Sequence, residues 1–422
     1  MRRILALFPS AWDRAEFASP RYAGCFEFIL AGPDRLRFPR NLSLLTFNVH
    51  DFIENLVARH GRARIDGVVS TDDMIGVAVA AIVARRLGLP GPDPAAVIRA
   101  QHKYCARLAQ QRALPEATPA FALLPARNGH DGVPGLAFPL FLKPVKGTYS
   151  AFTCRVDDPA DLKRRLSFGL VESFVLRRLT RPFNDLLARY AGGEHDANRF
   201  LGEQVAEGAQ VTLDGFVHGG RVEVLGVVDA VMFPGTHTFR RFEYPSRLSA
   251  AVHGRMTDLA RRLIESIGFD HGPFNIEMTH DPATAEVKII EMNPRLSPQF
   301  SDLYEKVDGT NTYDALIDLA LGRAPVWHRA AGRHAHAASF VLRTFRGSRI
   351  RAAPGPERID RIRRRHPDAR VMIFGRPKQR MTWEMRALGS YRCAVINLGA
   401  ASRESLDESF RDVEADLPFA FD

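Results

Sequence analysis

The chain contains, at residues 289–295, the segment Ile289-Ile290-Glu291-Met292-Asn293-Pro294-Arg295. An apolar run that ends in a carboxylate, an amide and an arginine predicts a buried strand with chemistry at its end. Alternate side chains of a strand share one face, so Glu291 and Asn293 should point the same way, roughly 7 Å apart along the chain. Both side chains offer oxygen atoms to a ligand.

A second apolar strand with a carboxylate precedes this segment, Phe274-Asn275-Ile276-Glu277-Met278, and a turn-rich stretch lies between the two. A hairpin centred on Thr284 would place Glu277 directly opposite Glu291. Facing like charges repel unless a cation lies between them. Oxygen ligands favour Mg²⁺ over zinc, so we predict a magnesium site at Glu277, Glu291 and Asn293. The alternative is a pair of ordinary carboxylates on an exposed strand, but each interrupts an apolar run, and burying an unpaired carboxylate is costly.

These residues resemble the ATP-grasp family. In that family a Glu on one strand and a Glu-x-Asn on the next hold Mg²⁺ against the phosphates of ATP, and the following Pro-Arg directs an arginine at the reacting centre. Glu277, Glu291, Asn293 and Arg295 match this pattern in order and spacing. The resemblance therefore implies Mg²⁺, with Mn²⁺ as the alternative, and a catalytic role for Arg295.

The resemblance also implies ATP-binding residues upstream. Lys103 corresponds to the first phosphate-contacting lysine, and Lys143 to the lysine that reaches adenine and the α-phosphate. A small-residue loop over the phosphates and a hinge that reads adenine should follow. The implied ATP contacts are Lys103, Lys143, Gly147, Thr148, Ser150, Glu203, Gln204, Val205 and Gln210.

Three departures from the family pattern bear on the substrate. Gln210 stands where relatives often have a ribose-binding Glu, and Thr148 and Tyr149 replace small lid residues. Many relatives have a glycine pair after the Asn-Pro-Arg, where this chain has residues 296–300, Leu-Ser-Pro-Gln-Phe. We therefore expect an acceptor substrate that is unusual for the family. The aromatic and cationic loop 233–245 is expected to form a pocket wall, with candidate substrate contacts at Arg240, Arg241, Tyr244 and Ser297.

The fold expected is α/β, in the α+β ATP-grasp arrangement. Residues 1–99 should form an N-terminal Rossmann-like domain with a parallel sheet, including a strand over 65–70 and a helix over 73–87. Residues 100–325 should form the ATP-grasp domain, with a helix over 100–114, a mobile lid over about 115–202, an antiparallel catalytic sheet and a closing helix over 303–321. Residues 326–422 should form a small C-terminal α+β domain with strands over 338–345, 370–374 and 391–398.

The composition is that of an ordinary globular protein, with 45% hydrophobic and 25% charged residues and a net charge of +10. We expect that charge to be spread, with its densest cluster, 358–366, on a solvated helix face rather than on a nucleic-acid surface. No apolar run approaches the ~20 residues of a membrane span. The four scattered cysteines favour a reducing, cytoplasmic location. We expect a small-molecule carboxylic acid and an amine as partners, with no nucleic acid and no membrane. A homodimer is the candidate assembly.

The resemblance implies an ATP- and Mg²⁺-dependent ligase that joins a small carboxylic acid to an amine through an acyl phosphate, with an amino acid among its substrates. One alternative is an ATP-grasp kinase or carboxylase. A second alternative is a non-catalytic nucleotide-binding protein. The sequence names neither the acid nor the amine.

Overall fold

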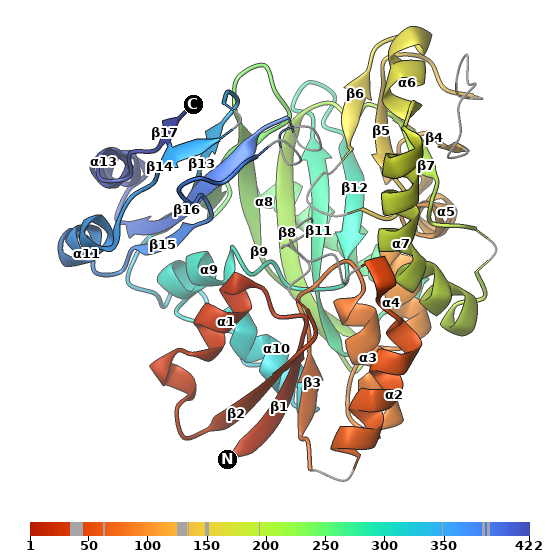
Figure 1. Ribbon diagram of the computed structural model, residues 1–422, viewed down its shortest axis with the longest axis horizontal. Helices are drawn as coiled ribbons and strands as arrows, with labels where there is room; N and C mark the ends of the chain where they lie inside the picture. Colours follow the sequence, from red (N-terminus) through yellow and green to blue (C-terminus); the bar gives the residue numbers. More distant parts are fainter. Residues whose placement is uncertain are drawn as a thin grey trace.

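The computed structural model describes residues 1–33, 45–61, 64–124, 133, 135–147, 152–193, 195–347, 349–381, 385 and 389–422. The expected α/β architecture is confirmed. A parallel sheet, a large antiparallel sheet, a smaller lid sheet and their helices surround one central region (Figure 1).

The N-terminal segment forms a three-stranded parallel sheet in the order β2-β1-β3. The expected helix over 73–87 begins three residues later, because Asp72 Oδ1 accepts hydrogen bonds from the backbone nitrogens of Ile75 and Gly76 at 3.0 and 2.8 Å. Residues 70–75 thus form a loop at the carboxyl end of a parallel strand, where α/β sheets place ligand groups. The elements are β1 (Arg2–Leu7), α1 (Ala11–Phe17), β2 (Phe26–Ala31), α2 (Val49–His60), β3 (Gly67–Val69) and α3 (Gly76–Arg86).

Two helices expected to be continuous are each broken in two. The helix over 100–114 is interrupted at His102, which has extended backbone angles and whose ring caps the next helix by accepting from the Cys105 nitrogen at 3.2 Å. The closing helix over 303–321 is interrupted at Gly309, whose φ of 74° is left-handed. The resulting pairs are α4 (Pro94–Gln101) with α5 (Lys103–Ala113), and α9 (Ser301–Asp308) with α10 (Thr312–Ala320).

The region expected to be a lid forms a four-stranded sheet in the order β4-β7-β5-β6. Leu140, Leu142, Val156 and Phe200 are buried together beneath its helices. In Figure 1 this unit lies at the upper right, beside β12. Its elements are β4 (Phe121–Leu124), β5 (Leu140–Pro144), β6 (Cys154–Val156), α6 (Pro159–Leu166), α7 (Leu170–Tyr190) and β7 (Phe200–Gln204).

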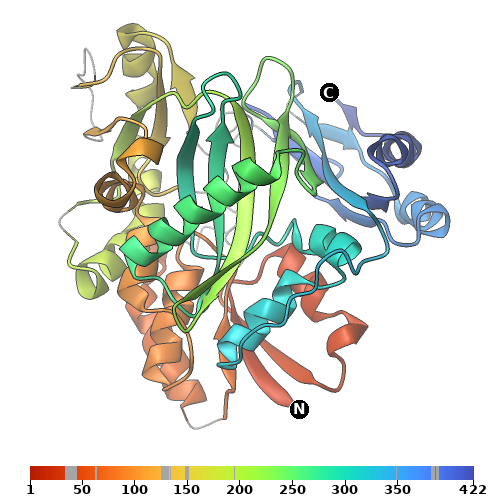
Figure 2. The ribbon, with the colours of Figure 1, turned by 180° about the vertical axis from the view of Figure 1, so that it is seen from behind.

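The large antiparallel sheet has eight strands in the order β12-β11-β8-β9-β10-β13-β16-β15. Helix α8 (Ala250–Ile267) crosses one face, as Figure 2 shows, and buries Met256 and Leu263 there with Leu213 and Ile276 of the sheet. Side chains at alternate positions therefore face the opposite side, toward the N-terminal segment. The strands are β8 (Ala209–His218), β9 (Arg221–Met232), β10 (Phe239–Tyr244), β11 (Gly272–His280), β12 (Val287–Asn293), β13 (His336–Thr344), β15 (Arg370–Ile373) and β16 (Tyr391–Ala400).

The C-terminal segment contains the three expected strands, but they do not form a sheet of their own. Strand β13 pairs with β10, with Phe242 opposite Ser339, so β13, β16 and β15 extend the large sheet without a break. The segment adds α11 (Pro356–Arg365), α13 (Arg403–Ala415) and a small sheet of β14 (Ile350–Ala352) with β17 (Ala420–Phe421).

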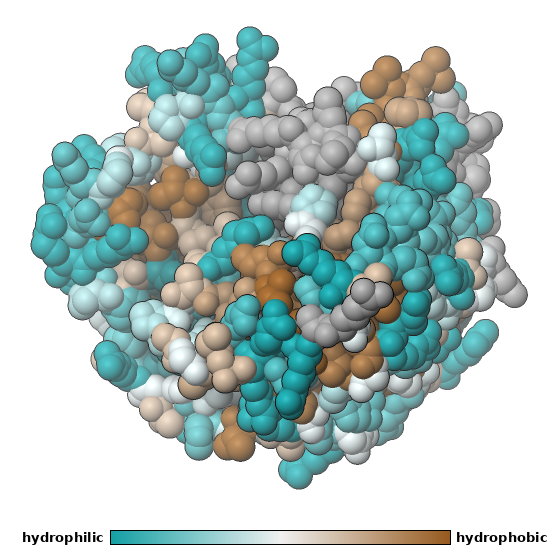
Figure 3. Space-filling view, turned by 60° about the horizontal axis from the view of Figure 1, so that its bottom comes forward, coloured by the Kyte–Doolittle hydropathy of each residue, from teal (hydrophilic) through white to brown (hydrophobic). Residues whose placement is uncertain are grey.

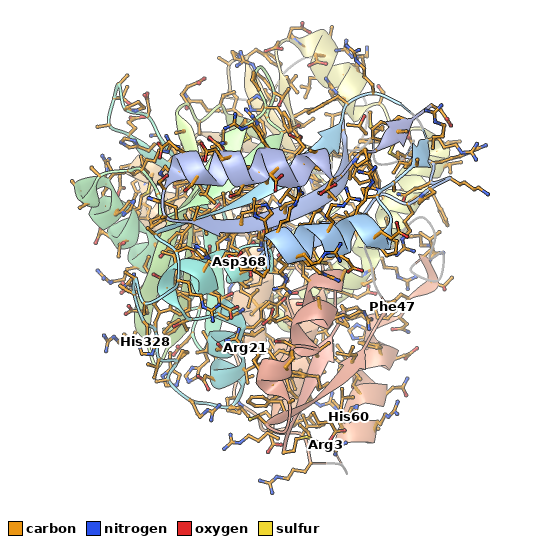
Figure 4. The ribbon with its side chains drawn as sticks, turned by 90° about the vertical axis from the view of Figure 1, so that its left-hand side faces the viewer. Arg3, Arg21, Phe47, His60, His328 and Asp368 are labelled. Atoms are coloured by element: carbon orange, nitrogen blue, oxygen red, sulfur yellow. The ribbon has the colours of Figure 1, made fainter. Side chains whose placement is uncertain are left out.

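Ion pairs tie the N-terminal segment to the rest of the chain. Glu16 on α1 is buried and pairs with Arg370 of β15 at 2.8 Å. Arg21, labelled in Figure 4, lies where the N-terminal segment meets α9 and α10, and it pairs with Asp314 at 2.9 Å and Glu305 at 3.0 Å. These contacts fix the parallel sheet against the large antiparallel sheet.

The basic excess is concentrated rather than spread, contrary to our expectation. Residues 343–392 carry 15 basic and four acidic residues, an excess of 11 against a net charge of +10 for the whole chain. The 358–366 cluster lies on helix α11, as expected, and several of its arginines pair with acids of α13; Arg361 lies 3.1 Å from Asp416. This part of the excess is therefore neutralised within the fold.

The surface that Figure 3 presents is mainly hydrophilic, with apolar residues in separate small areas. Among the helices of the described residues, none combines the length and the apolar character that a bilayer crossing requires.

Candidate active site

The two metal-candidate strands pair as the sequence predicted. Glu277 of β11 lies opposite Glu291 of β12, and Asn275 lies opposite Asn293. The register shifts just beyond Glu277, where Met278 pairs with Ile289, so Ile290 is an extra residue in β12. This β-bulge turns the apolar Ile289 toward α8 while Glu291 keeps the opposite face.

The bulge also leaves two consecutive carbonyl oxygens on an edge strand, and cations bind both. Arg107 of α5 donates to the Ile289 and Ile290 oxygens at 2.7 Å each, and Lys143 of β5 donates to the Ile290 oxygen at 3.1 Å. A buried carbonyl without a partner would be costly. These contacts join the lid sheet and α5 to the catalytic sheet.

Glu203 of β7 completes this cross-link. Its carboxylate accepts two hydrogen bonds from Arg107, at 2.6 and 3.1 Å, and lies 2.8 Å from the Lys143 nitrogen. All three side chains are at most 5% exposed. Burial lowers the pKa of Lys143 to about 8, although Glu203 opposes that shift. The Glu203 carboxylate thus positions two cations, and adenine recognition by residues 203–205 would use their backbone groups.

Further lysines border a cleft between the N-terminal segment, the lid and the catalytic sheet. Lys103 lies 3.3 Å from Glu291 and donates to the Gly147 oxygen at 3.0 Å. Lys146 donates to the backbone oxygen of Asp73 at 2.6 Å, and burial lowers its pKa to about 8. The cleft is narrow, with a cavity volume of about 10 Å³. Its lining includes Asp73, Gln101, Lys103, Arg107, Lys143, Lys146, Ile290, Glu291 and Asn293.

A buried hydrogen-bond chain sets the orientation of Asn293. Tyr304 donates to Asp214 at 2.9 Å, Asn275 donates to Asp214 at 2.8 Å, and Asn293 donates from Nδ2 to Asn275 Oδ1 at 3.2 Å. A carboxylate at the start of the chain can only accept, so each amide nitrogen points toward Asp214. The remaining polar atom of Asn293 is therefore its oxygen, the atom that a hard cation requires.

The carboxylate pair also fits a divalent cation. Burial, and next the facing charge of Glu291, raise the pKa of Glu277 to about 7, although Arg295, Lys103 and Lys143 oppose the shift. Gln210 donates to Glu277 Oε2 at 2.8 Å, so this side chain lies at the carboxylate pair. Within the described ranges, no group of three or more His, Cys, Asp or Glu side chains is arranged so that it could hold a metal ion. The candidate donor set is instead two carboxylates and one amide oxygen, which matches Mg²⁺.

Magnesium affinity should depend on pH through Glu277. The folded-state pKa is raised, so below about pH 7 the carboxyl holds a proton that metal binding must displace. We expect the apparent Mg²⁺ dissociation constant to be about tenfold higher at pH 6 than at pH 8. Titration calorimetry in buffers of different ionisation enthalpy should detect proton release on binding at pH 6. Equal affinities at the two pH values would contradict the assignment.

Arg295 lies at the boundary with the N-terminal segment. Its guanidinium donates to the Leu296 oxygen at 3.3 Å and lies 3.7 Å from Asp73 Oδ2. Asp73 and Arg295 are 15% and 18% exposed, so both are partly accessible. Asp73 comes from the loop at the carboxyl end of β3, which brings the parallel sheet into the site.

The expected pocket wall over 233–245 needs correction. Tyr244 is a core residue that donates to Asp308 at 2.6 Å and packs on Tyr304. Arg241 faces the C-terminal segment, where it pairs with Asp407 at 2.6 Å, and Arg240 is exposed outside the cleft lining. Arg241 and Tyr244 lie on opposite faces of β10, a central strand of the sheet, whereas Arg240 stands at a register shift in the pairing of β10 with β9.

The other predicted positions have mixed outcomes. Ser297 is half-buried in the loop after Arg295, Gln204 is exposed and Val205 is half-buried. Thr148 and Ser150 lie outside the described residues. We did not single out Asp73, Arg107 or Lys146 from sequence, although Arg107 lies one helical turn after Lys103 and shares its face.

A family model and curated relatives match parts of the chain. Residues 136–301 match the family model of the ATP-grasp domain. The chain is 25% identical to the protein y4rH of Sinorhizobium fredii over 286 residues, which are 66% of this chain and 53% of y4rH. It is 27% identical to the carbamoyl phosphate synthase large chain of Xylella fastidiosa over 167 residues, which are 40% of this chain and 14% of that protein. The chain thus spans about half of y4rH and a small part of the synthase.

Solved structures share the fold over the whole chain. An L-amino acid ligase from Bacillus licheniformis superposes with a TM-score of 0.72 at 16% identity, and the match covers 100% of this chain and 99% of the ligase. A phosphoribosylglycinamide synthetase from Anaerococcus prevotii gives a TM-score of 0.66 at 14% identity, with 100% of both chains covered. At these identities the likeness shows the fold.

Proposed function

Because the chain is an ATP-grasp protein, we propose that it is an ATP- and Mg²⁺-dependent ligase that joins a small carboxylic acid to an amine, with an amino acid as one substrate. The observation that carries the proposal is the Glu277–Glu291 pair, of which Glu291 lines a cleft bordered by Lys103, Lys143 and Lys146. Cations on one side and a metal site on the other suit a triphosphate.

The proposed reaction has two steps. A carboxylate oxygen of the acid attacks the γ-phosphorus of ATP, the bond from that phosphorus to the bridging oxygen breaks, and ADP leaves. The amine nitrogen then attacks the acyl carbon, and phosphate leaves with the oxygen of the broken acyl–oxygen bond. When bound, Mg²⁺ supplies charge neutralisation of the phosphates. The protein contributes positioning and fixed positive charge.

Each cation has a place in this scheme. Lys103 and Lys146 would hold phosphate oxygens, and Lys143, fixed by Glu203, would lie deeper toward the nucleotide. Arg295 would grip the substrate carboxylate with its two-pronged guanidinium and stabilise the oxyanion that forms on amine attack. Glu277, Glu291 and the oxygen of Asn293 would hold the metal.

A phosphate-release screen tests the proposal, with purified protein, Mg-ATP and acids and amines supplied singly and in pairs. We expect release that requires an acid, ligated product when an amine is added, and a hydroxamate when hydroxylamine replaces the amine. Phosphate transfer to a hydroxyl would favour the kinase alternative, and bicarbonate-dependent turnover the carboxylase alternative. Tight ATP binding without turnover under any condition would favour the non-catalytic alternative.

Arg295→Lys should separate substrate handling from nucleotide binding. The variant keeps the charge but loses the two-pronged geometry, and losing a charge-assisted hydrogen bond costs about 1.5–3 kcal/mol, or roughly 10- to 100-fold in rate. Acid-dependent phosphate release should fall by that factor while ATP affinity changes little. Arg240→Lys, on the exposed part of β10, is the matched control and should behave as wild type. A loss of ATP binding with unaltered turnover per bound ATP would move Arg295 to the nucleotide site.

A further inference from the structure

Asp73 is held in the cleft from several directions. Its backbone oxygen accepts from Gln101 Nε2 at 2.7 Å and from Lys146 at 2.6 Å, and Gln101 lies 3.3 Å from its Oδ1. Two residues earlier, Thr71 donates to both oxygens of the buried Asp13, at 2.8 and 2.9 Å. These hydrogen bonds hold the loop in place, so the Asp73 carboxylate borders the cleft in a defined position.

The distance between the charged groups of Asp73 and Arg295 is longer than that of a hydrogen bond. The two charges lie 3.7 Å apart, whereas charge-assisted hydrogen bonds measure about 2.7–2.9 Å. The charges therefore attract each other without a hydrogen bond between these two atoms. A small ligand that carries one positive and one negative charge can contact Asp73 through the first and Arg295 through the second, each at a shorter distance.

Asp73 carries its charge in the absence of nucleotide. Burial raises the pKa of Asp73, but Arg295, Lys146 and Lys103 together outweigh burial and hold the pKa below its usual value. A bound triphosphate would compete for the two lysines. Asp73 would then be a partly buried carboxylate that has lost some of its counter-charge, and another cation would be favourable beside it.

We propose that Asp73 binds the α-ammonium group of an amino-acid substrate whose carboxylate lies against Arg295. This inference rests on the proposed ligase function and names the class of the acid. An α-amino acid carries its ammonium and carboxylate on one carbon, so it is compact enough to bridge an aspartate and an arginine at this separation. A monocarboxylate without an ammonium group would leave Asp73 without a partner, and a dicarboxylate would repel it.

The test compares amino acids with matched acids that lack the α-amino group, alanine with propanoate being the smallest pair. For each active pair, kcat/KM is measured with the wild type, Asp73→Asn and Asp73→Glu. The wild type should prefer the amino acid, and Asp73→Asn should reduce that preference about 10- to 100-fold, chiefly through KM for the amino acid. Asp73→Glu keeps the charge and should recover part of the preference. The dissociation constant for ATP should change little in Asp73→Asn.

Calorimetry provides a readout that does not need turnover. Alanine should bind the wild type more tightly with a non-hydrolysable ATP analogue and Mg²⁺ present than without them, and Asp73→Asn should lose this gain.

Each contrary result has a defined meaning. Equal use of the amino acid and the matched acid by the wild type would overturn the ammonium site and leave the ligase function standing. A uniform loss on both substrates in Asp73→Asn would assign Asp73 a merely structural role and overturn the proposal. No product from any acid with the wild type would overturn both.

Discussion

Glutamine in place of Glu291 is expected to lower acid-dependent ATP turnover at least about 1,000-fold. The substitution preserves size but removes one of two charges that oppose each other across β11 and β12. A metal ion contributes several kcal/mol to charge stabilisation in phosphoryl transfer, and about 4 kcal/mol corresponds to three orders of magnitude. The measurement is phosphate release at saturating ATP across a range of Mg²⁺ concentrations.

The fold should survive this change, because removing one charge relieves repulsion within the pair. The melting temperature of Glu291→Gln should stay close to that of the wild type. Glu286→Gln is the matched control, since Glu286 is exposed near the turn of the same hairpin and lies 3.5 Å from Lys288. Near-wild-type turnover in a folded Glu291→Gln protein would refute the metal site.

Methionine in place of Arg107 should destabilise the protein by about 3–5 kcal/mol, the usual effect of breaking a buried ion pair from one side. Arg107 is 2% exposed and binds Glu203 and two carbonyl oxygens of β12. Methionine keeps an unbranched chain of similar length but removes the Arg107 donor from the Ile289 oxygen, and it leaves Glu203 and the Ile290 oxygen with Lys143. Urea denaturation followed by intrinsic fluorescence measures the change in midpoint.

Arg112→Met is the control for Arg107→Met. Arg112 lies on the same helix, but its side chain is exposed, so its substitution should change stability by no more than about 0.5 kcal/mol. Equal midpoints for the two variants would show that the Arg107 cross-link adds nothing to the fold. A lower urea midpoint for Arg107→Met, with no change for Arg112→Met, would show that Arg107 anchors α5 to the bulge of β12.

The metal-candidate hairpin could be predicted because its signals are local. Alternation in each strand and a turn at the midpoint fix which side chains face each other, and Glu277 does lie opposite Glu291. The bulge at Ile290 has no such signal, since Ile289 and Ile290 are both residues that an ordinary strand would contain. Arg107 shares a helix face with Lys103, but nothing in the sequence indicated that this face of α5 would contact β12.

Contacts between distant segments could not be read from the sequence. Asp73 and Arg295 are 222 positions apart by their numbers, and only the packing of the parallel sheet on the catalytic sheet brings them together. Tyr244 showed the opposite problem: an aromatic residue near arginines suggested a pocket, but the strand was central and its side chain joined the core. Local sequence patterns therefore predict the strands themselves better than they predict which segments pack against those strands.

The unbroken pairing of β10 with β13 limits how this architecture can be divided during evolution. A gene that ended near residue 325 would encode a β10 with an open edge, whose backbone groups would invite pairing with other chains. Loss of the C-terminal segment would therefore have to be accompanied by a new strand, helix or subunit that covers this edge. The segment is an integral part of the sheet, and its residues are expected to vary together with those of β10 rather than as an exchangeable module.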